Sequence, residues 1–543
     1  MLQGHGGQLA TAVARAHGID TMFTLSGGHV FPLYDGAVKG EPPMRLVDVR
    51  HEQSAVFAAE GLAKLTRTPG LAVLTAGPGV TNGVSAVTTA HFNGSPLLVI
   101  GGRAAQVRWG SGALQELDHP PLLAPVTKYA GTVDSVEAIP AAVDGALRLA
   151  ATPHRGPVFL DVPIDVLFSH GEVEAPEVTP PQRIAPDSDA LARMAALLAK
   201  ATRPVLVLSS AVWADRAEEA ARRAAETMGL PTITNGMGRG VLPAGHPLLV
   251  TRARSKAFAG ADLVLVVGAP LDFRLGYGEF AGGAAVCQLT DSPAELAAHV
   301  DLAGSASGDL TLALDGLVAA WERQPSHAPY TDWVSELRAI ADAAVAADSS
   351  TLDSDAEPIH PARVYRELNR QLSDDAVVIG DGGDFVSYAG KFVEPRRPGC
   401  WLDPGPYGCL GTGLGYAIAA RIARPSAPIF LMLGDGAAGF SLMDVDTLVR
   451  HDLPLVMIVG NNGIWGLEKH PMRFLYGYDV AADLGTQTRY DEVVRALGGA
   501  GELVTRPADL APAITRALDS GVPYLVNVAT DPEIAYPRST TGI

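Results

Sequence analysis

Two polar segments in the last third of the chain have the residue types of a metal and phosphate site. Gly434-Asp435-Gly436 follows the apolar run 429–433, and Asn461-Asn462 follows the apolar run 455–459. The distance along the chain between the two segments is about one strand–helix–strand crossover, which would bring both to the same edge of a parallel sheet. Carboxylate and amide oxygens suit Mg²⁺ carrying a phosphate. Taken singly, the segments would also be explained by a tight turn and a helix cap, but together they favour a ligand site.

One acid near the start of the chain has a second possible chemistry. Glu52 follows Arg50-His51 and the short predicted strand 45–49, and it begins an Ala-rich stretch with helical character. A carboxylate at a helix start is often only a dipole or capping contact. General acid–base chemistry would instead require that this carboxyl lie in a poorly solvated site.

The elements that must position these residues follow a repeated pattern. Short apolar β-branched runs, then Gly or Pro, then Ala-rich helical stretches predict buried parallel strands with helices on both faces. Polar stretches around 166–185 and 323–357 divide the pattern. We therefore expect an α/β protein with three doubly wound parallel-sheet domains, at residues 1–165, 186–325 and 358–543.

Composition excludes several classes of protein. The 543 residues carry a formal net charge of −18, which disfavours a general role in binding nucleic acid or an anionic membrane. Three cysteines are too few for a disulfide scaffold, and no apolar run reaches the roughly 18 residues of a membrane helix. The first residues lack the pattern of a secretory signal, so we expect a cytoplasmic protein.

The segment from Gly434-Asp435-Gly436 to Asn461-Asn462 resembles the diphosphate-anchoring motif of thiamine-diphosphate enzymes. The resemblance covers nearly the whole chain, in the family's order of pyrimidine-binding, middle and diphosphate-binding domains. It implies that Asp435, Asn462 and the backbone carbonyl of Ile464 hold Mg²⁺. It also implies that Glu52 bonds the cofactor's pyrimidine N1′ and thereby promotes loss of the proton at thiazolium C2.

The same resemblance implies the rest of the cofactor site. Gly77-Pro78-Gly79 with Asn82 is similar to the pyrimidine-side loop, and Leu410 would hold the cofactor in its V shape. Gly380-Asp381-Gly382-Gly383-Asp384 is near a dinucleotide-binding pattern, but we assign it to the diphosphate pocket. The expected cofactor-binding residues are Gly28, Pro78, Asn82, Asp384, Phe385, Gly408, Leu410, Gly434, Gly436, Ala437, Ile464 and Trp465.

The substrate side resembles two branches of this family. Gly112-Ala113-Leu114-Gln115-Glu116 is similar to a segment shared by acetohydroxyacid synthases and 2-hydroxyacyl-CoA lyases, which implies that Gln115 and Glu116 face the reacting carbonyl as catalytic residues. The segment after Asn462 departs from the pattern of both branches: Pro471 and Met472 stand near the positions where synthases have a Trp and a Gln, which weakens the assignment as an acetolactate synthase. The expected substrate pocket consists of Leu114, Trp465, Leu467, Glu468 and His470.

The middle domain resembles that of oxalyl-CoA decarboxylases and 2-hydroxyacyl-CoA lyases, which implies bound ADP. Arg252, Arg254 and Lys256 form a basic cluster suited to a nucleotide phosphate, although a solvated basic face would look the same. Asp272-Phe273-Arg274 resembles a segment of flavin-binding synthases and keeps FAD open. The expected nucleotide residues are Arg155, Arg252, Arg254, Lys256, Asp272, Arg274 and Asp291.

These resemblances rank the possible functions. The first is a lyase that cleaves a 2-hydroxyacyl-CoA, such as 2-hydroxyisobutyryl-CoA, to a ketone or aldehyde plus formyl-CoA; the second is an acetolactate synthase that ligates 2-ketoacids. A noncatalytic nucleotide-binding relative and a dinucleotide-dependent oxidoreductase rank below both. The resemblance further implies a dimer or tetramer in which Glu52 of one chain serves Asp435 of another, and residues 535–541 would suit a tail folded over a CoA thioester.

Overall fold

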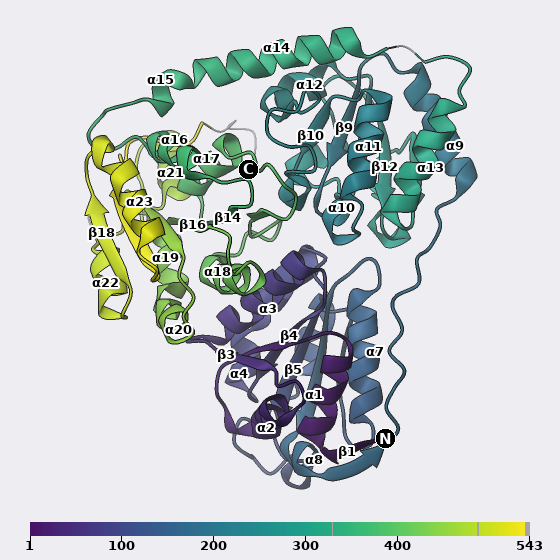
Figure 1. The fold of residues 1–543 in the computed structure, drawn as a ribbon, viewed down its shortest axis with the longest axis vertical. Coiled ribbons are helices and arrows are strands. Elements are labelled where there is room, and N and C mark those ends of the chain that lie inside the picture. The colour runs from purple at the N-terminus through teal and green to yellow at the C-terminus, as the bar shows by residue number, and fades with distance from the viewer. Residues whose placement is uncertain (328, 486–487, 538–543) are drawn as a thin grey trace.

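The protein has three α/β domains, each built on a parallel sheet (Figure 1). This computed structural model describes residues 1–327, 329–485 and 488–537. The amino-terminal domain lies at the bottom of the view, the middle domain at upper right and the carboxyl-terminal domain at upper left. The predicted fold class is therefore confirmed.

The amino-terminal domain has a six-stranded sheet in the order β3-β2-β4-β5-β7-β6. A short antiparallel pair, β1 with β8, extends this domain to Val173, past the expected boundary at 165. Its strands are β1 Leu2–His5, β2 Thr21–Thr24, β3 Arg45–Asp48, β4 Gly70–Leu74, β5 Leu97–Arg103, β6 Tyr129–Thr132, β7 Pro157–Pro163 and β8 His170–Val173. Its helices are α1 Gly6–Ala16, α2 Phe31–Lys39, α3 Glu52–Thr66, α4 Pro78–Asn82, α5 Val84–Phe92, α6 Pro120–Leu123, α7 Ile139–Ala151 and α8 Ile164–Phe168.

The middle domain has a five-stranded sheet in the order β10-β9-β11-β12-β13. In β11, Leu263, Leu265 and Val267 belong to the core on one face, while Val264 and Val266 belong to the core on the other. The strands are β9 Pro204–Leu208, β10 Thr232–Thr234, β11 Leu263–Val267, β12 Ala285–Thr290 and β13 Gly304–Ser307. The helices are α9 Ser188–Lys200, α10 Ser210–Ala214, α11 Glu218–Met228, α12 Arg254–Gly260 and α13 Leu310–Glu322.

The carboxyl-terminal domain has a six-stranded sheet in the order β15-β14-β16-β17-β19-β18. Neighbouring residues of β16 again enter opposite cores, which explains why its sequence is a continuous apolar run. The strands are β14 Val377–Asp381, β15 Trp401–Leu402, β16 Ile429–Gly434, β17 Val456–Asn461, β18 Ala500–Val504 and β19 Tyr524–Ala529. The helices are α16 Pro361–Gln371, α17 Asp384–Phe392, α18 Thr412–Ala423, α19 Asp435–Ser441, α20 Val445–Arg450, α21 Gly466–Tyr476, α22 Tyr490–Ala496 and α23 Leu510–Asp519.

The first and third domains share one hydrophobic core, although they are far apart in sequence. Helix α3 packs against α18 at the centre of the molecule (Figure 1). Val56 of α3, Leu414 of α18 and Leu431 of β16 lie in the same apolar cluster. Polar contacts add to it, because Ser54 donates to Asp444 Oδ2 at 2.5 Å. The site-bearing edges of these two domains are thus held in a fixed relation within one chain.

A long helix joins the middle domain to the carboxyl-terminal domain. Part of the polar stretch at 323–357 forms α14 (Thr331–Ala347) and α15 (Ser349–Leu352), and α14 runs along the top of both domains (Figure 1). Its inner face is apolar, with Trp333, Leu337 and Ala341 buried against the middle domain. The stretch therefore fixes the third domain against the second.

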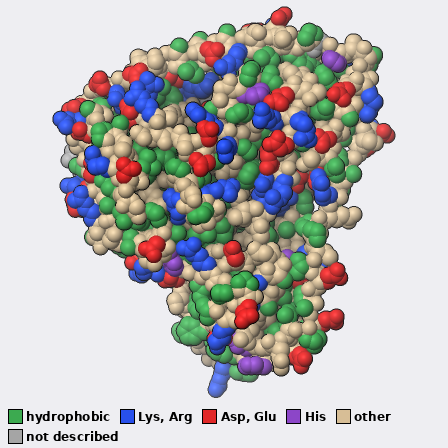
Figure 2. Space-filling model, in the orientation of Figure 1, with side chains coloured by type: hydrophobic (Ala, Val, Ile, Leu, Met, Phe, Trp, Pro, Cys, Tyr) green, Lys and Arg blue, Asp and Glu red, His purple; other side chains and the backbone are tan. Residues whose placement is uncertain are grey.

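The surface carries both signs of charge on all three domains. Figure 2 shows acidic and basic side chains interspersed over one face of the molecule. In the part of the chain that the structure describes, no helix combines the length and apolar character needed to cross a bilayer. The exclusion of nucleic acid as a partner stays a prediction.

Candidate cofactor and catalytic site

The carboxyl ends of β14, β16 and β17 border a cavity of about 840 Å³, including its open mouth. This is the edge at which parallel α/β sheets bind ligands. Many of the expected residues come from separate loops and meet there. Those that line the cavity are Asp384, Phe385, Gly408, Leu410, Gly434, Asp435, Gly436, Ala437, Asn462, Ile464, Trp465, Leu467 and Glu468.

Asp435 is the buried acid of this cavity, with 4% of its surface exposed. Its Oδ1 accepts a hydrogen bond from the Gly436 amide at 2.9 Å, and its Oδ2 accepts one from the Gly463 amide at 2.6 Å. Burial raises the pKa of Asp435 to about 6, even though these backbone donors favour the charged form. The carboxylate is therefore fixed in direction, and a cation beside it would stabilise its charged form.

Asn462 supplies a neutral oxygen beside this carboxylate. Its Oδ1 accepts the Ile464 amide at 3.2 Å, which orders the turn between β17 and α21. Among the described residues, no group of three or more His, Cys, Asp and Glu side chains could hold a metal. A divalent cation at Asp435 would thus rely on amide and carbonyl oxygens and on the oxygens of a bound phosphate, as in hard oxygen sites for Mg²⁺.

The glycines of the cavity have different surroundings. A methyl group built at Gly434 would meet no atom within 4 Å, so that the backbone there faces open space in the cavity. A methyl group at Gly436 would lie 2.4 Å from the ring of Trp465. The cavity therefore has an open backbone surface at Gly434 that could accept a phosphate, and a wall at Gly436 that leaves no room for a side chain. These residues fit a diphosphate held through a metal.

Glu52 lies at the corresponding edge of the amino-terminal sheet. It is the first residue of α3, is buried, and its Oε2 accepts a hydrogen bond from Asn82 Nδ2 at 3.0 Å. Asn82 ends the short helix α4, which begins at Pro78 directly after the loop that follows β4. The predicted pair of catalytic acid and pyrimidine-side loop is thus in contact.

The segment expected to face the substrate follows β5 at the same edge. Gln115 has a left-handed backbone, with φ 60°, and its atoms lie against Gly77. Leu114 is 78% exposed. Glu116 Oε2 accepts the amides of Gly110 and Ala113, so this carboxylate closes its own loop. In this arrangement Gln115 is better placed than Glu116 to face a ligand.

The expected residues therefore form two groups within one chain. Glu52, Gly28, Pro78, Asn82 and Gln115 all belong to the amino-terminal domain, where Glu52 begins α3, Pro78 and Asn82 begin and end α4, and Gly28 and Gln115 lie outside the α-helices and strands. None is among the described residues that line the Asp435 cavity.

The expected pocket residue His470 also lies outside the lining of that cavity. It belongs to α21, and its Nε2 is buried without a hydrogen-bond partner in the described part of the chain.

Three further polar residues at the amino-terminal edge escape sequence reasoning. His119 and Asp161 are fully buried and hydrogen-bonded to each other, and Arg103 pairs with Asp161. The signal that could have revealed them is the lone acid in the otherwise apolar strand 157–163, because a buried carboxylate needs polar partners.

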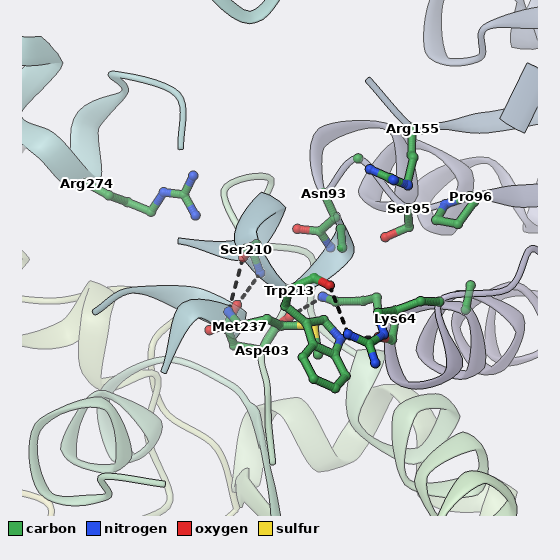
Figure 3. Close-up of a pocket in the computed structure, with 15 residues that line it drawn as sticks. Lys64, Asn93, Ser95, Pro96, Arg155, Ser210, Trp213, Met237, Arg274 and Asp403 are labelled. Carbon is green, nitrogen blue, oxygen red and sulfur yellow. Dashed lines mark hydrogen bonds between the residues drawn. The ribbon is translucent and has the colours of Figure 1, made fainter. Parts of the chain in front are cut away.

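A second cavity, of about 530 Å³, lies where the three domains meet (Figure 3). An adjoining cavity of about 520 Å³ borders the carboxyl ends of β9, β11 and β12. Arg155 and Arg274 line the first, and Arg274 and Asp291 line the second. Asp272 pairs with Arg274 at 2.7 Å, and Arg254 donates to the Arg274 carbonyl. The structure thus gathers five of the expected nucleotide residues.

The other two expected nucleotide residues point elsewhere. Arg252 pairs with Asp348, next to α15, and donates to the Lys391 carbonyl of α17 at 2.9 Å. Lys256 is exposed on α12. The basic cluster expected from Arg252, Arg254 and Lys256 is therefore divided: its first member joins two domains, and its last faces solvent.

The carboxyl-terminal tail contacts the Asp435 cavity through residues 535 and 536. The Tyr536 amide donates to Asp384 Oδ1 at 2.9 Å, and Tyr388 donates to the Ala535 carbonyl at 3.2 Å. The tail expected to cover a CoA thioester spans 535–541, and residues 538–541 lie outside the described residues.

Comparison with known families assigns all three domains. Residues 5–122 match the model of the thiamine pyrophosphate enzyme amino-terminal TPP binding domain, residues 191–317 its central domain, and residues 381–528 its carboxyl-terminal TPP binding domain. Thiamine pyrophosphate is another name for thiamine diphosphate. The order agrees with the three sheets of the structure.

Curated relatives match nearly the whole chain. The acetolactate synthase large subunit IlvG of Mycobacterium tuberculosis is 50% identical over 539 residues, which are 98% of this chain and 97% of the relative. The 2-hydroxyacyl-CoA lyase 2 of Caenorhabditis elegans is 35% identical over 92% of this chain and 84% of its own length, and the human protein of that name is 34% identical over 92% and 85%. The three domains, the cavity at the carboxyl ends of β14, β16 and β17, and these matches agree: the chain belongs to the thiamine pyrophosphate enzyme family.

Proposed function

We propose that the chain is a thiamine-diphosphate-dependent acetolactate synthase, which decarboxylates pyruvate and ligates the product to a second 2-ketoacid. The observation that carries this proposal is the 50% identity to the mycobacterial synthase over 98% of this chain and 97% of the relative, against 35% for the lyase. The residues alone rank the lyase first, and the relatives reverse that order.

Thiamine diphosphate, when bound, supplies a carbon nucleophile and an electron sink for bonds beside a carbonyl. On the diphosphate side, Asp435, Asn462 and the Ile464 carbonyl would hold Mg²⁺ against the two phosphates. The open backbone at Gly434 would admit the phosphates, because no side chain occupies that space. The support is the donor set, one buried carboxylate with neutral oxygens around it.

On the pyrimidine side, Glu52 would hold the proton that it shares with the pyrimidine N1′. Glu52 is buried at the start of α3, so a ligand bound there, and not bulk water, would be its partner in proton transfer. The amide of Asn82 orients the carboxylate through the 3.0 Å hydrogen bond. Leu410, which lines the opposite cavity, would support the cofactor by packing alone.

The substrate would lie beyond the cofactor, between the cavity mouth and the Gln115 segment. Trp465 and Leu467 give the mouth an apolar wall, and Glu468 gives it a polar rim. The Gln115 amide can donate to a carbonyl oxygen or accept from a hydroxyl. Leu114, at 78% exposed, would gain cover from the substrate or from a second chain.

The complete site would need two copies of the chain. Glu52 and Asp435 belong to different domains, and Glu52 does not line the Asp435 cavity within the described residues of one chain. Exposed apolar side chains flank both edges, including Leu114, Phe440 and Met443, which are 78%, 54% and 54% exposed. We propose a dimer or a tetramer. Sedimentation that found a fully active monomer would contradict it.

A 2-hydroxyacyl-CoA lyase is the second candidate, and one observation favours it. The helix after Asn462 carries Pro471 and Met472, near the positions where the resemblance gives synthases a Trp and a Gln, and this difference weighs against a synthase. The relatives at 34–35% identity bear the lyase name, over 92% of this chain. In that reaction the substrate would be a CoA thioester, and formyl-CoA would be a product.

The cavity among the three domains would hold a nucleotide, ADP or FAD. Arg155 and Arg274 are suited to a diphosphate, and Asp291 to a ribose hydroxyl. Asp291 is already bonded to His154 at 3.0 Å, so that a ribose would have to share or replace this contact. Mass spectrometry of nucleotide released from the purified protein would separate ADP from FAD, and a yellow protein would indicate the flavin.

The deciding experiment offers the purified protein, with thiamine diphosphate and Mg²⁺, either pyruvate or 2-hydroxyisobutyryl-CoA and identifies the products by mass spectrometry. Acetolactate from pyruvate is the expected result. Acetone with formyl-CoA, and no acetolactate, would establish the lyase and overturn the first candidate while leaving the cofactor assignment intact.

A further inference from the structure

His119 is a buried imidazole that joins two loops of the amino-terminal site edge. None of its surface is exposed. Its Nε2 lies 3.0 Å from the Gly77 amide, and its Nδ1 lies 3.0 Å from Asp161 Oδ2. His119 lies four residues after Gln115 in sequence, while Gly77 precedes the pyrimidine-side helix α4.

These partners determine the tautomer of the ring. A backbone amide only donates, so Nε2 must carry the lone pair and Nδ1 the hydrogen. Asp161 Oδ2 accepts that hydrogen and is also paired with Arg103 Nη1 at 2.8 Å. Because Asp161 is fully buried, Arg103 offsets its charge and holds the acceptor in place. The imidazole is thus a neutral bridge with one donor and one acceptor in fixed positions.

The Nε2 of His119 accepts a hydrogen bond at a point of the pyrimidine-side loop that depends on glycine. Gly77 is buried and has φ 61°, a conformation that favours glycine. A methyl group built on it would lie 2.9 Å from Gln115 Cβ, so the two loops are in direct contact at this point. Without the imidazole, the buried Gly77 amide would lose its hydrogen-bond acceptor.

Gly77 is linked to Glu52 through the short helix α4. Gly77 leads into α4, which has five residues and ends at Asn82. Asn82 donates to Glu52 Oε2 at 3.0 Å. A shift of the loop at Gly77 would therefore move the one side-chain donor that the structure gives this carboxylate within the described residues.

We propose that His119 is a positioning residue for catalysis: its Nε2 fixes the Gly77 loop and, through Asn82, the direction of the Glu52 carboxylate. The inference rests on the proposed function in one respect, the role of Glu52 in removing the C2 proton of the cofactor. It does not depend on which substrate the enzyme takes.

Two substitutions separate the two hydrogen bonds of the ring. In His119→Gln, the amide oxygen can reach the place of Nε2 and accept from Gly77, while the bond to Asp161 is lost. In His119→Asn, the amide nitrogen takes the place of Nδ1 and donates to Asp161, while Gly77 loses its acceptor. Each variant removes one bond and keeps a polar amide, so they control for one another.

The readout is exchange of the cofactor C2 proton for deuterium, measured by NMR with protein, thiamine diphosphate and Mg²⁺ alone. We expect His119→Gln to exchange at close to the wild-type rate. We expect His119→Asn to exchange about 10²-fold more slowly, because a misplacement near 1 Å costs about that factor. Cofactor affinity, measured by fluorescence titration, should change little in either variant.

Other outcomes have definite meanings. Equal exchange rates in wild type and His119→Asn, or equal losses in the Asn and Gln variants, would overturn the positioning role. If thermal unfolding shows that the Asn variant does not fold, His119→Leu, which removes both bonds without adding a polar group, should show the same loss, and wild-type exchange in it would overturn the proposal. Wild-type protein that binds the cofactor without accelerating exchange would instead remove the proposed role of Glu52, and the inference with it.

Discussion

Asn82 Nδ2 donates to Glu52 Oε2 at 3.0 Å, and this hydrogen bond joins the end of the short helix α4 to the start of α3. The carboxylate is buried, so this hydrogen bond replaces water that the group has lost. The hydrogen bond also fixes the direction of the carboxylate, which favours the proton exchange with a bound cofactor that we propose for Glu52.

Replacement of Glu52 by glutamine tests this role. Glu52→Gln keeps the volume and an acceptor for Asn82 but cannot take up a proton. We expect exchange of the cofactor C2 proton and turnover to fall about 10²- to 10⁴-fold, the range of general acid–base contributions, with cofactor binding retained. Glu137→Gln, at an exposed position, is the matched control. Normal exchange in Glu52→Gln would show that another group activates the cofactor.

Asp435 should determine how much Mg²⁺ the protein needs to bind the cofactor. In Asp435→Asn the carboxylate becomes neutral, and Mg²⁺ loses the charged ligand of a site that otherwise has neutral oxygens. We expect the Mg²⁺ concentration for half-maximal cofactor binding to rise at least about tenfold, because even outer partners of metal ligands cost that much. Asp452→Asn is the control, since Asp452 is exposed in the same domain and its φ of 52° suits asparagine. An unchanged Mg²⁺ requirement would place the metal elsewhere.

Gly436 should tolerate no side chain, whereas a neighbour on the same helix should. The added methyl of Gly436→Ala would lie 2.4 Å from the Trp465 ring, and overpacking of this kind costs about 1–3 kcal/mol. We expect a lower unfolding temperature and weaker cofactor binding. Gly439→Ala meets no atom within 4 Å and should leave both unchanged or raise stability by about 0.5–1 kcal/mol. Circular dichroism melts with and without cofactor measure both variants.

Arg252 should act in stability and not in nucleotide binding. It pairs with Asp348 and donates to the Lys391 carbonyl, so it joins the middle domain to the carboxyl-terminal domain. We expect Arg252→Met to lower the free energy of unfolding by about 1–3 kcal/mol, as for hydrogen bonds of charged groups. Nucleotide affinity should fall in Arg274→Met instead. Lys256→Met, at an exposed position, should change neither the free energy of unfolding nor the nucleotide affinity. A loss of nucleotide affinity in this variant would show that the basic cluster binds the nucleotide.

Asp381 should make stability depend on pH. It is buried at the end of β14, where burial raises its pKa to about 7 although Gly411 and Gly413 donate to it. The folded state therefore binds the proton more tightly than the unfolded state. The resulting stability is full below the unfolded pKa near 3.8 and is lost as the pH rises through about 7.

The variant Asp381→Asn cannot titrate but keeps an oxygen for the same amides. In urea unfolding at pH values on both sides of 7, its stability relative to wild type should rise with pH and then level off. A constant difference across that range would show that Asp381 keeps one protonation state in the folded protein.

Local sequence determined the strands and the residues that follow them. The run 429–433 predicts a strand because both of its faces are apolar, and the structure places them in two cores. Parallel strands bring the residues after them to one edge, so Asp435 and Asn462 could be expected to meet from their spacing alone. The resemblance added the identity of the ligand and the likeness of Glu52 to an activating acid.

Tertiary structure alone decided the partners of the charged and polar residues. A sequence shows that Arg252 is basic, but only the packing of α14 and α17 against the middle domain gives it Asp348, at the end of α14, and the Lys391 carbonyl. The hydrogen bond from the Gly77 amide to His119 joins residues 42 positions apart, and no local sequence pattern predicts it. The reason is physical: burial in a strand or helix follows from local apolar periodicity, whereas the partner of a polar group depends on which elements pack together.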